Sequence, residues 1–229
     1  YCYFLLKKYT EAAADNVKAL DIDGDEMAFD NLKILADSAF DVIDFKLKVQ
    51  QMLQPNNYYW PYCRGMIHEY TEKFGEAIPL YEECKNIKFN PMVMRRISAC
   101  QYQMGHFAEA LEANREGLDA DSTIYNLIMD KAVYLDELGR SEEAIAEYTH
   151  AIELAPDNAH GYQMRGWVKE QMGDTIGAIE DYSMAIMTDP DLIYVRYSRG
   201  KLYQKSGQQE LAKKDFEFVV STDVDSTDY

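Results

Sequence analysis

The chain has 229 residues, and 47% of them are hydrophobic, which is enough for a continuous core and excludes a disordered chain. It carries 40 acidic and 23 basic side chains, and the net charge of −17 argues against general nucleic-acid binding and favours neutral or basic partners. The apolar runs are far shorter than the ~20 residues that cross a bilayer, so membrane insertion is not expected. The compartment is not identified, although the cytoplasm is slightly favoured.

The first part of the chain predicts helices without clear punctuation between them. Residues 1–26 predict a partial helix pair, whose helical face holds Tyr9, Ala12, Asn16 and Ala19. Residues 27–57 carry two helical stripes, Met27–Ser38 and Phe40–Gln54, and we interpret them as a degenerate pair without the usual glycine. Asp21–Glu26 has the composition of a calcium loop, but the ligand spacing is wrong, so a turn between helices is expected there.

From residue 58 onward the sequence repeats itself every 33 or 34 residues. Four glycines follow one another at intervals of 34 residues: Gly105, Gly139, Gly173 and Gly207. An alanine comes five residues after each glycine, and the alanine series extends back to Ala77 and Ala12. Such a period is the signature of a repeat architecture. It divides this part of the chain into residues 58–90, 91–124, 125–158, 159–192 and 193–226.

Each period predicts a helix, a short turn and a second helix. In residues 159–192 one face of the first helix is formed by Tyr162, Arg165, Gly166 and Lys169. Gly173 then ends this helix, and a second apolar stripe runs from Ala178 until Pro190 stops it. The period-two alternation that is typical of strands is absent. The predicted fold class is therefore all-α, with residues 1–229 forming a single solenoid of antiparallel helix pairs.

These segments resemble the tetratricopeptide-repeat family, whose 34-residue units carry small residues at positions 8, 20 and 27 and an aromatic residue at position 24. With each segment numbered from its first residue, position 8 is Gly65, Ser98, Ala132, Gly166 and Gly200. Position 24 is Tyr81, Asn114, Tyr148, Tyr182 and Phe216, and position 27 is Cys84, Gly117, Ala151, Ala185 and Val219. Small side chains allow two helix backbones to approach closely. The resemblance implies a right-handed superhelix whose concave face binds a peptide or helix.

Positions 7 and 23 vary together, as expected if they face each other between the two helices of a pair. The charged combinations are Lys131 with Glu147, Arg165 with Asp181, and Arg199 with Asp215. An apolar combination, Ile97 with Ala113, replaces them in residues 91–124, and Arg64 with Leu80 departs from the rule. The pattern predicts partly buried ion pairs within the last three helix pairs.

No combination of residues predicts catalysis, a cofactor or a metal. The four histidines lie on different segments without the spacing of metal ligands: His68, His106, His150 and His160. The four cysteines form no CxxC motif and are expected to be free, with Cys63, Cys84 and Cys100 buried. The nucleophile motif G-x-S-x-G and a glycine-rich phosphate loop are also absent. The sequence therefore predicts a protein that is not an enzyme.

Positions 2, 5, 9 and 12 of each first helix form the face that the family resemblance assigns to a partner. This face is rich in Tyr, Met and Trp, which are enriched in interfaces. The predicted binding residues are Tyr59, Tyr62, Met66, Arg95, Tyr102, Met129, Gln163, Trp167, Tyr194, Tyr197 and Lys201. The alternative is a tight superhelix, in which these side chains pack on neighbouring repeats.

The predicted function is a protein–protein interaction scaffold or adaptor, with a groove that binds a peptide or helix of a neutral or basic partner. One alternative is the non-catalytic scaffolding or regulatory arm of a longer enzyme or sensor. This alternative is favoured by the ends of the sequence, because no polar closing helix follows Ser221 and the array looks cut. A second alternative is a self-association module that uses its uncapped terminal helices.

Overall fold

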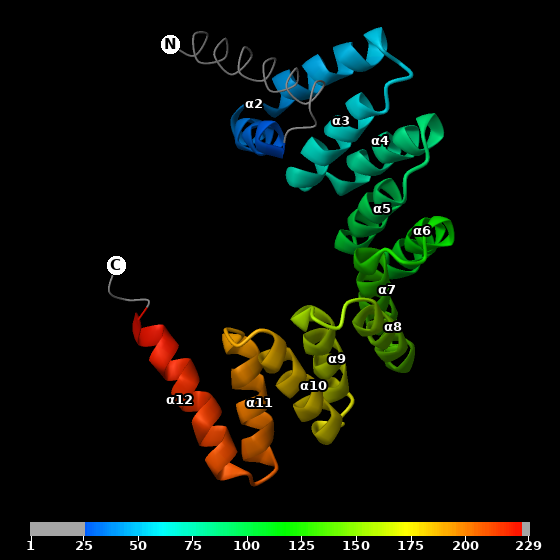
Figure 1. Ribbon diagram of the computed structural model, residues 1–229. Coiled ribbons are helices and arrows are strands. Elements are labelled where there is room, and N and C mark those ends of the chain that lie inside the picture. The colour runs from blue at the N-terminus through cyan, green and yellow to red at the C-terminus, as the bar shows by residue number, and fades with distance from the viewer. Residues whose placement is uncertain (1–25, 226–229) are drawn as a thin grey trace. The chain divides into compact units, whose positions relative to one another are not determined.

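The computed structural model describes residues 26–225, with side chains from residue 40 to residue 222. Every regular element in this range is an α-helix, so the expected all-α class is confirmed (Figure 1). None of these helices is both long and apolar enough to span a membrane. The partial pair expected over residues 1–26, and the calcium-loop alternative beside it, lie almost wholly outside the described range.

The chain forms two compact units, Tyr1–Asp121 and Ser122–Tyr229, which we call unit 1 and unit 2. The helices of unit 1 are α2 (Glu26–Leu53), α3 (Tyr59–Tyr70), α4 (Phe74–Ile87), α5 (Pro91–Gln103) and α6 (Phe107–Ala120). Those of unit 2 are α7 (Tyr125–Glu137), α8 (Ser141–Leu154), α9 (Ala159–Gln171), α10 (Thr175–Thr188), α11 (Ile193–Lys205) and α12 (Gln209–Asp225). Within each unit, every helix packs against the helices that precede and follow it in the chain.

Helix α2 is one continuous helix, whereas the sequence predicted a degenerate pair of helices over residues 27–57. A single helix runs from Glu26 to Leu53, through the place where the sequence suggested a break between Ser38 and Phe40. The reason is that this stretch contains neither glycine nor proline, so no residue favours a helix end. The segment therefore enters unit 1 as one long helix instead of a helix pair, and α3 packs against it.

The turn inside each helix pair depends on a residue with a left-handed backbone. Gly139 has a φ of 72°, and the three other periodic glycines have φ values from 76° to 83°. The Gly139 N–H donates to the Asp136 carbonyl at 2.8 Å, and the Arg140 N–H donates to the Leu135 carbonyl at 2.9 Å. These two hydrogen bonds form a Schellman motif, which satisfies the last carbonyls of α7. The predicted role of the glycines as helix stops is confirmed.

In the first helix pair Glu72 occupies the place of the glycine. It has a φ of 59° and makes the same two-bond turn, because its N–H donates to Glu69 and the Lys73 N–H donates to His68. A residue with a Cβ adopts this conformation at a cost of about 1 kcal/mol. The turn is thus retained in residues 58–90 despite the missing glycine.

We expect Gly139→Ala to lower the free energy of unfolding by about 1 kcal/mol, because alanine is strained at a positive φ. A Cβ at this position would meet no atom within 4 Å, so conformation alone sets the cost. Urea unfolding measures it. Gly75→Ala, at a helical φ in α4, is the control and should not destabilise, whereas Glu72→Gly should be neutral or stabilising. An equal loss of unfolding free energy for Gly75→Ala would show that the positive φ of Gly139 is not the cause of the destabilisation.

The small residues at position 8 receive the aromatic ring at position 24 of the same pair. A Cβ on Gly166 would lie 2.9 Å from the Tyr182 ring, and one on Gly200 would lie 2.7 Å from the Phe216 ring. Both distances are too short for a real side chain. The helices therefore approach closely enough for the ring to occupy the space of the missing side chain, as the sequence pattern predicted.

We expect Ala144→Leu to lower the melting temperature, because Ala144 is fully buried in α8 and three extra carbons would overpack the helix contact. The destabilisation should be about 1–3 kcal/mol. Ala146→Leu is the matched control, because Ala146 is exposed on the same helix. Equal melting temperatures for the two variants would show that the assigned register is wrong.

Candidate binding surface

Ion pairs connect the two helices in each pair of unit 2, and they set the orientation of the first helices. The Arg165 guanidinium binds the Asp181 carboxylate at 2.7 Å, and the distance from Arg199 to Asp215 is 2.6 Å. Lys131 and Glu147 lie 2.6 Å apart. All three predicted pairs are therefore confirmed.

Arg64 departs from the pairing of position 7 with position 23, because it binds residues of α2 in place of a residue of its own second helix. Its Nε donates to Asp44 at 2.7 Å, and its Nη1 donates to Gln51 at 2.8 Å. Burial would raise the pKa of Asp44, but the nearby His68, at 3.3 Å, and the hydrogen-bonded Arg64 hold this pKa well below its usual value. A basic residue at position 7 thus anchors the long helix to the first repeat.

In unit 1 the predicted binding residues are half-buried. Tyr62 and Met66 of α3 pack against the core formed with α4 and α5, and the ring of Tyr62 lies 5.8 Å from that of Tyr81. The ring of Tyr102 lies 5.5 Å from the ring of Phe107. Tyr59 and Arg95 are also only partly accessible. Packing within the repeats therefore accounts for Tyr62, Met66 and Tyr102 in this unit.

In unit 2 the predicted residues divide into covered and exposed side chains. Met129 is 5% exposed and cannot contribute to an accessible face, and Gln163 is half-buried. By contrast, the exposed fractions are 45% for Trp167, 85% for Tyr194 and 48% for Tyr197. Lys201 is also exposed, with its Nζ 5.5 Å from the ring centre of Tyr197. We call Trp167, Tyr194, Tyr197 and Lys201 on α9 and α11 the first-helix surface.

The acidic residues at position 12 hold the helix pairs together. The Tyr182 hydroxyl donates to Glu170 at 2.7 Å, and the Tyr81 hydroxyl donates to Glu69 at the same distance. Burial and the carboxylate raise the pKa of Tyr182 above its usual value. Because these carboxylates already accept an internal hydrogen bond, they bind the second helix of their own pair and are less suited to a partner.

A pocket lies between the first helices of consecutive pairs, near their C-terminal ends, in both units. In unit 1 its volume is about 430 Å³, and it is lined by Met66, Glu69, Tyr70, Glu72, Phe74, Arg96, Ala99 and Gln103. In unit 2 its volume is about 500 Å³, and it is lined by Glu170, Gln171, Thr175, Lys201, Leu202, Gln204 and Lys205. Only Met66 and Lys201 of the predicted binding residues line these pockets.

The two pockets differ in charge. In unit 1 the basic side chain of Arg96 is paired with Glu69 at 3.1 Å, and Glu72 adds a second acid. In unit 2, no carboxylate within residues 40–222 comes within ion-pair distance of Lys201 or Lys205. Lys205 follows Lys201 by one helical turn, so the i, i+4 spacing could have identified it from the sequence. The unit 2 pocket is consequently the one with available positive charge.

The described side chains provide no metal site, and the cysteines are chemically protected. No group of three His, Cys, Asp or Glu residues in that part of the chain could hold a metal ion. Cys63, Cys84 and Cys100 form no disulfide with one another and are buried, as expected. Burial raises the pKa of the Cys84 and Cys100 thiols to about 12, so the reactive thiolate is scarce at neutral pH.

We expect the folded Cys2→Ser variant to react only very slowly with a thiol reagent. At about pH 7 this reaction should be far slower than that of an exposed thiol, whose pKa lies near 8.5, because thiols with a pKa of about 12 are almost entirely protonated there. In denaturant all three thiols should react at once. Reagent absorbance measures both rates, with free cysteine as the control. A fast reaction of the folded protein would contradict the described burial.

Comparisons with known proteins agree with this geometry. Residues 125–158 and 193–223 match the family model for the tetratricopeptide repeat. These two segments are tetratricopeptide repeats. The resemblance drawn from the sequence is thereby confirmed. No curated protein matches the chain at a significant level.

Solved structures with the same fold are tetratricopeptide solenoids. The crystal structure of MamA is 22% identical, covers 72% of this chain and 97% of its own, and has a TM-score of 0.66. MamA from Desulfovibrio magneticus RS-1 is 16% identical, covers 75% and 97%, and has a TM-score of 0.67. YrrB, described as a TPR protein with an unusual peptide-binding site, is 16% identical, covers 82% and 98%, and has a TM-score of 0.60. Repeat proteins of this kind are generally non-catalytic protein–protein interaction scaffolds.

Proposed function

We propose that this protein binds a protein or peptide partner through the first-helix surface of unit 2. The observation that carries the proposal is the exposure of three aromatic side chains, Trp167, Tyr194 and Tyr197, on first helices of successive repeats. Large aromatic side chains on an accessible face are typical of the residues that dominate binding energy. Burying one such side chain contributes on the order of 1–3 kcal/mol.

The rigidity of the surface also supports binding. Arg165 and Arg199 hold α9 and α11 to their partner helices by ion pairs, so the aromatic side chains project from fixed elements. The ring of Tyr197 lies 5.9 Å from that of Phe216, which restricts its orientation. A preorganised surface loses less conformational entropy when a partner binds. An extended peptide or a helix can therefore bind without rearrangement of the repeats.

The unit 2 pocket supplies a polar contact beside these rings. Its two lysines, Lys201 and Lys205, favour an acidic side chain in the bound segment. The net charge of −17 favours a neutral or basic partner at long range, but close contacts decide which residue fits the pocket. We therefore propose a segment with apolar or aromatic residues and an acidic residue at the position that reaches Lys201.

Peptides selected from a random displayed library with the full chain test this function. We expect Trp167→Ala combined with Tyr197→Ala to weaken the selected peptides by at least about tenfold, because two interface side chains are removed. Fluorescence anisotropy measures the affinity, and circular dichroism should show unchanged helicity.

The matched control is Ile176→Ala combined with Met187→Ala, because these side chains are highly exposed on the second helix α10. This control should bind the peptides like the parent protein. Unchanged affinity for the Trp167 and Tyr197 variant would move the binding site away from the first-helix surface.

A further inference from the structure

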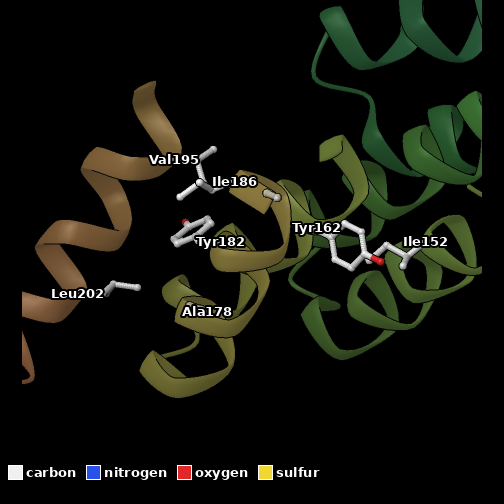
Figure 2. Packing of buried hydrophobic residues seen from close by; sticks show 8 residues of the cluster. Ile152, Tyr162, Ala178, Tyr182, Ile186, Val195 and Leu202 are labelled. Atoms are coloured by element: carbon white, nitrogen blue, oxygen red, sulfur yellow. The ribbon is translucent and has the colours of Figure 1, made fainter. Parts of the chain in front are cut away.

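The pockets of unit 1 and unit 2 lie at equivalent places, each between the first helices of two consecutive repeats and beside the hydrophobic core. In unit 2, Leu202 lines the pocket, and Figure 2 shows this side chain directed from α11 toward α10, where it packs in one cluster with Tyr182. In unit 1, Met66 and Phe74 line the pocket and pack against the cluster that contains Tyr81. The helices before α3 and after α5 in the chain, α2 and α6, are both present. The unit 1 pocket therefore belongs to the repeats and is not the open end of an array.

The two equivalent pockets differ at the positions that carry charge. In unit 1, Glu72 stands where unit 2 has the glycine of the turn, so a carboxylate is added. The two lysines of the unit 2 pocket are replaced at the same helix positions by uncharged residues, Ala99 and Gln103. Each of these changes makes the unit 1 pocket more negative than its counterpart.

The negative charge that remains available in the unit 1 pocket is that of Glu72. The basic side chain in the lining is Arg96, and its guanidinium binds Glu69 at 3.1 Å. The Glu69 carboxylate also accepts a hydrogen bond from the Tyr81 hydroxyl at 2.7 Å, so both charges of this pair are satisfied internally. By contrast, the exposed Glu72 carboxylate has no ion-pair or hydrogen-bond partner among the side chains of residues 40–222.

The backbone of Glu72 also indicates that its carboxylate serves the pocket. Its φ is 59°, at a place in the turn where the other repeats have glycine. A residue with a Cβ is strained in this conformation, and no polar contact of the side chain within residues 40–222 offsets the strain. Strained residues are concentrated at binding sites.

The walls of the unit 1 pocket are apolar. Tyr70, which is 41% exposed, and the half-buried Phe74 stand where unit 2 has the polar Gln171 and Thr175. The half-buried Met66 adds a flexible apolar side chain. An apolar wall with one carboxylate at its rim fits a side chain that has an aliphatic stem and a cationic head.

We infer that the unit 1 pocket is a second binding site, which takes an arginine side chain of a protein or peptide partner. The guanidinium binds the Glu72 carboxylate, and the stem packs on Met66, Tyr70 and Phe74. Arginine fits better than lysine, because its planar head also stacks on aromatic rings. The net charge of −17 attracts basic segments, and the parts of this chain outside the described range contain no arginine that could fill the pocket. The site does not depend on the first-helix surface of unit 2.

Arginine capped as its N-acetyl methylamide is the probe, and the isotope-labelled full chain is the receptor. We expect a saturable titration in which the NMR amide signals of Glu72, Phe74 and Ala99 shift. Capped citrulline is the matched ligand, because it has nearly the same shape without the charge. It should bind at least about fivefold more weakly, since the charge-assisted hydrogen bonds are lost.

Substitutions of Glu72 separate a lost contact from a folding defect. Glu72→Gln should weaken capped arginine by at least about fivefold. Glu72→Gly should weaken it as much in a protein that is at least as stable as the parent, because the strain is relieved. Glu109→Gln is the matched control, since Glu109 is exposed in unit 1 but does not line the pocket, and it should leave the affinity unchanged.

Three results would overturn the proposal: equal binding of capped arginine and capped citrulline, an equal loss with Glu109→Gln, or no saturable shift at Glu72. A dimer of the parent chain that shifts the same signals as the protein concentration rises would also overturn it, because a second copy would then fill the pocket.

Discussion

The close approach of two helices, made possible by a missing side chain at position 8, is the constraint on which the other contacts depend. Where Gly65, Gly166 or Gly200 stands, the aromatic ring at position 24 occupies the space of a Cβ. This contact fixes the distance between the two helices of a pair. Positions 7 and 23 then face each other within ion-pair reach, and the tyrosine hydroxyl meets the carboxylate at position 12. The packing therefore brings the polar partners together, and their contacts fix how the two helices of a pair are aligned along each other.

The arginine at position 7 also links successive repeats. Arg165 binds Asp181 in its own pair and Thr149 in the preceding one, so its guanidinium is satisfied on both sides. In unit 1 the equivalent Arg64 reaches Asp44 and Gln51 of α2. The same position therefore joins either a repeat or a long non-repeat helix to the following pair. This explains how α2 is held without the small-residue pattern of a repeat.

The sequence predicts well whatever depends on a single helix pair, and poorly whatever depends on neighbouring pairs. The glycine turns can be predicted from the 34-residue period alone. The ion pair of Arg199 with Asp215 can be predicted from the opposite charges at positions 7 and 23 of one repeat. Met129 and Trp167, by contrast, share one predicted face, yet one is buried and the other exposed. Their burial depends on the side chains of adjacent helices, which the position within a repeat does not specify. The period places Glu72 at the glycine position, five residues before Ala77, but its left-handed backbone could not be expected, because glutamate rarely adopts this conformation.

The contacts that each repeat position makes also indicate which positions can determine the choice of partner. Positions 7, 8, 12, 23 and 24 are occupied by contacts inside the helix pair, as Glu170 illustrates with its bond to Tyr182. A change there alters folding before it alters binding. Positions 2, 5, 9 and 13 of the first helix carry Tyr194, Tyr197, Lys201 and Lys205 and make few internal polar contacts. These positions can vary at little cost in stability, so differences in partner choice between repeats of this chain are expected to arise there.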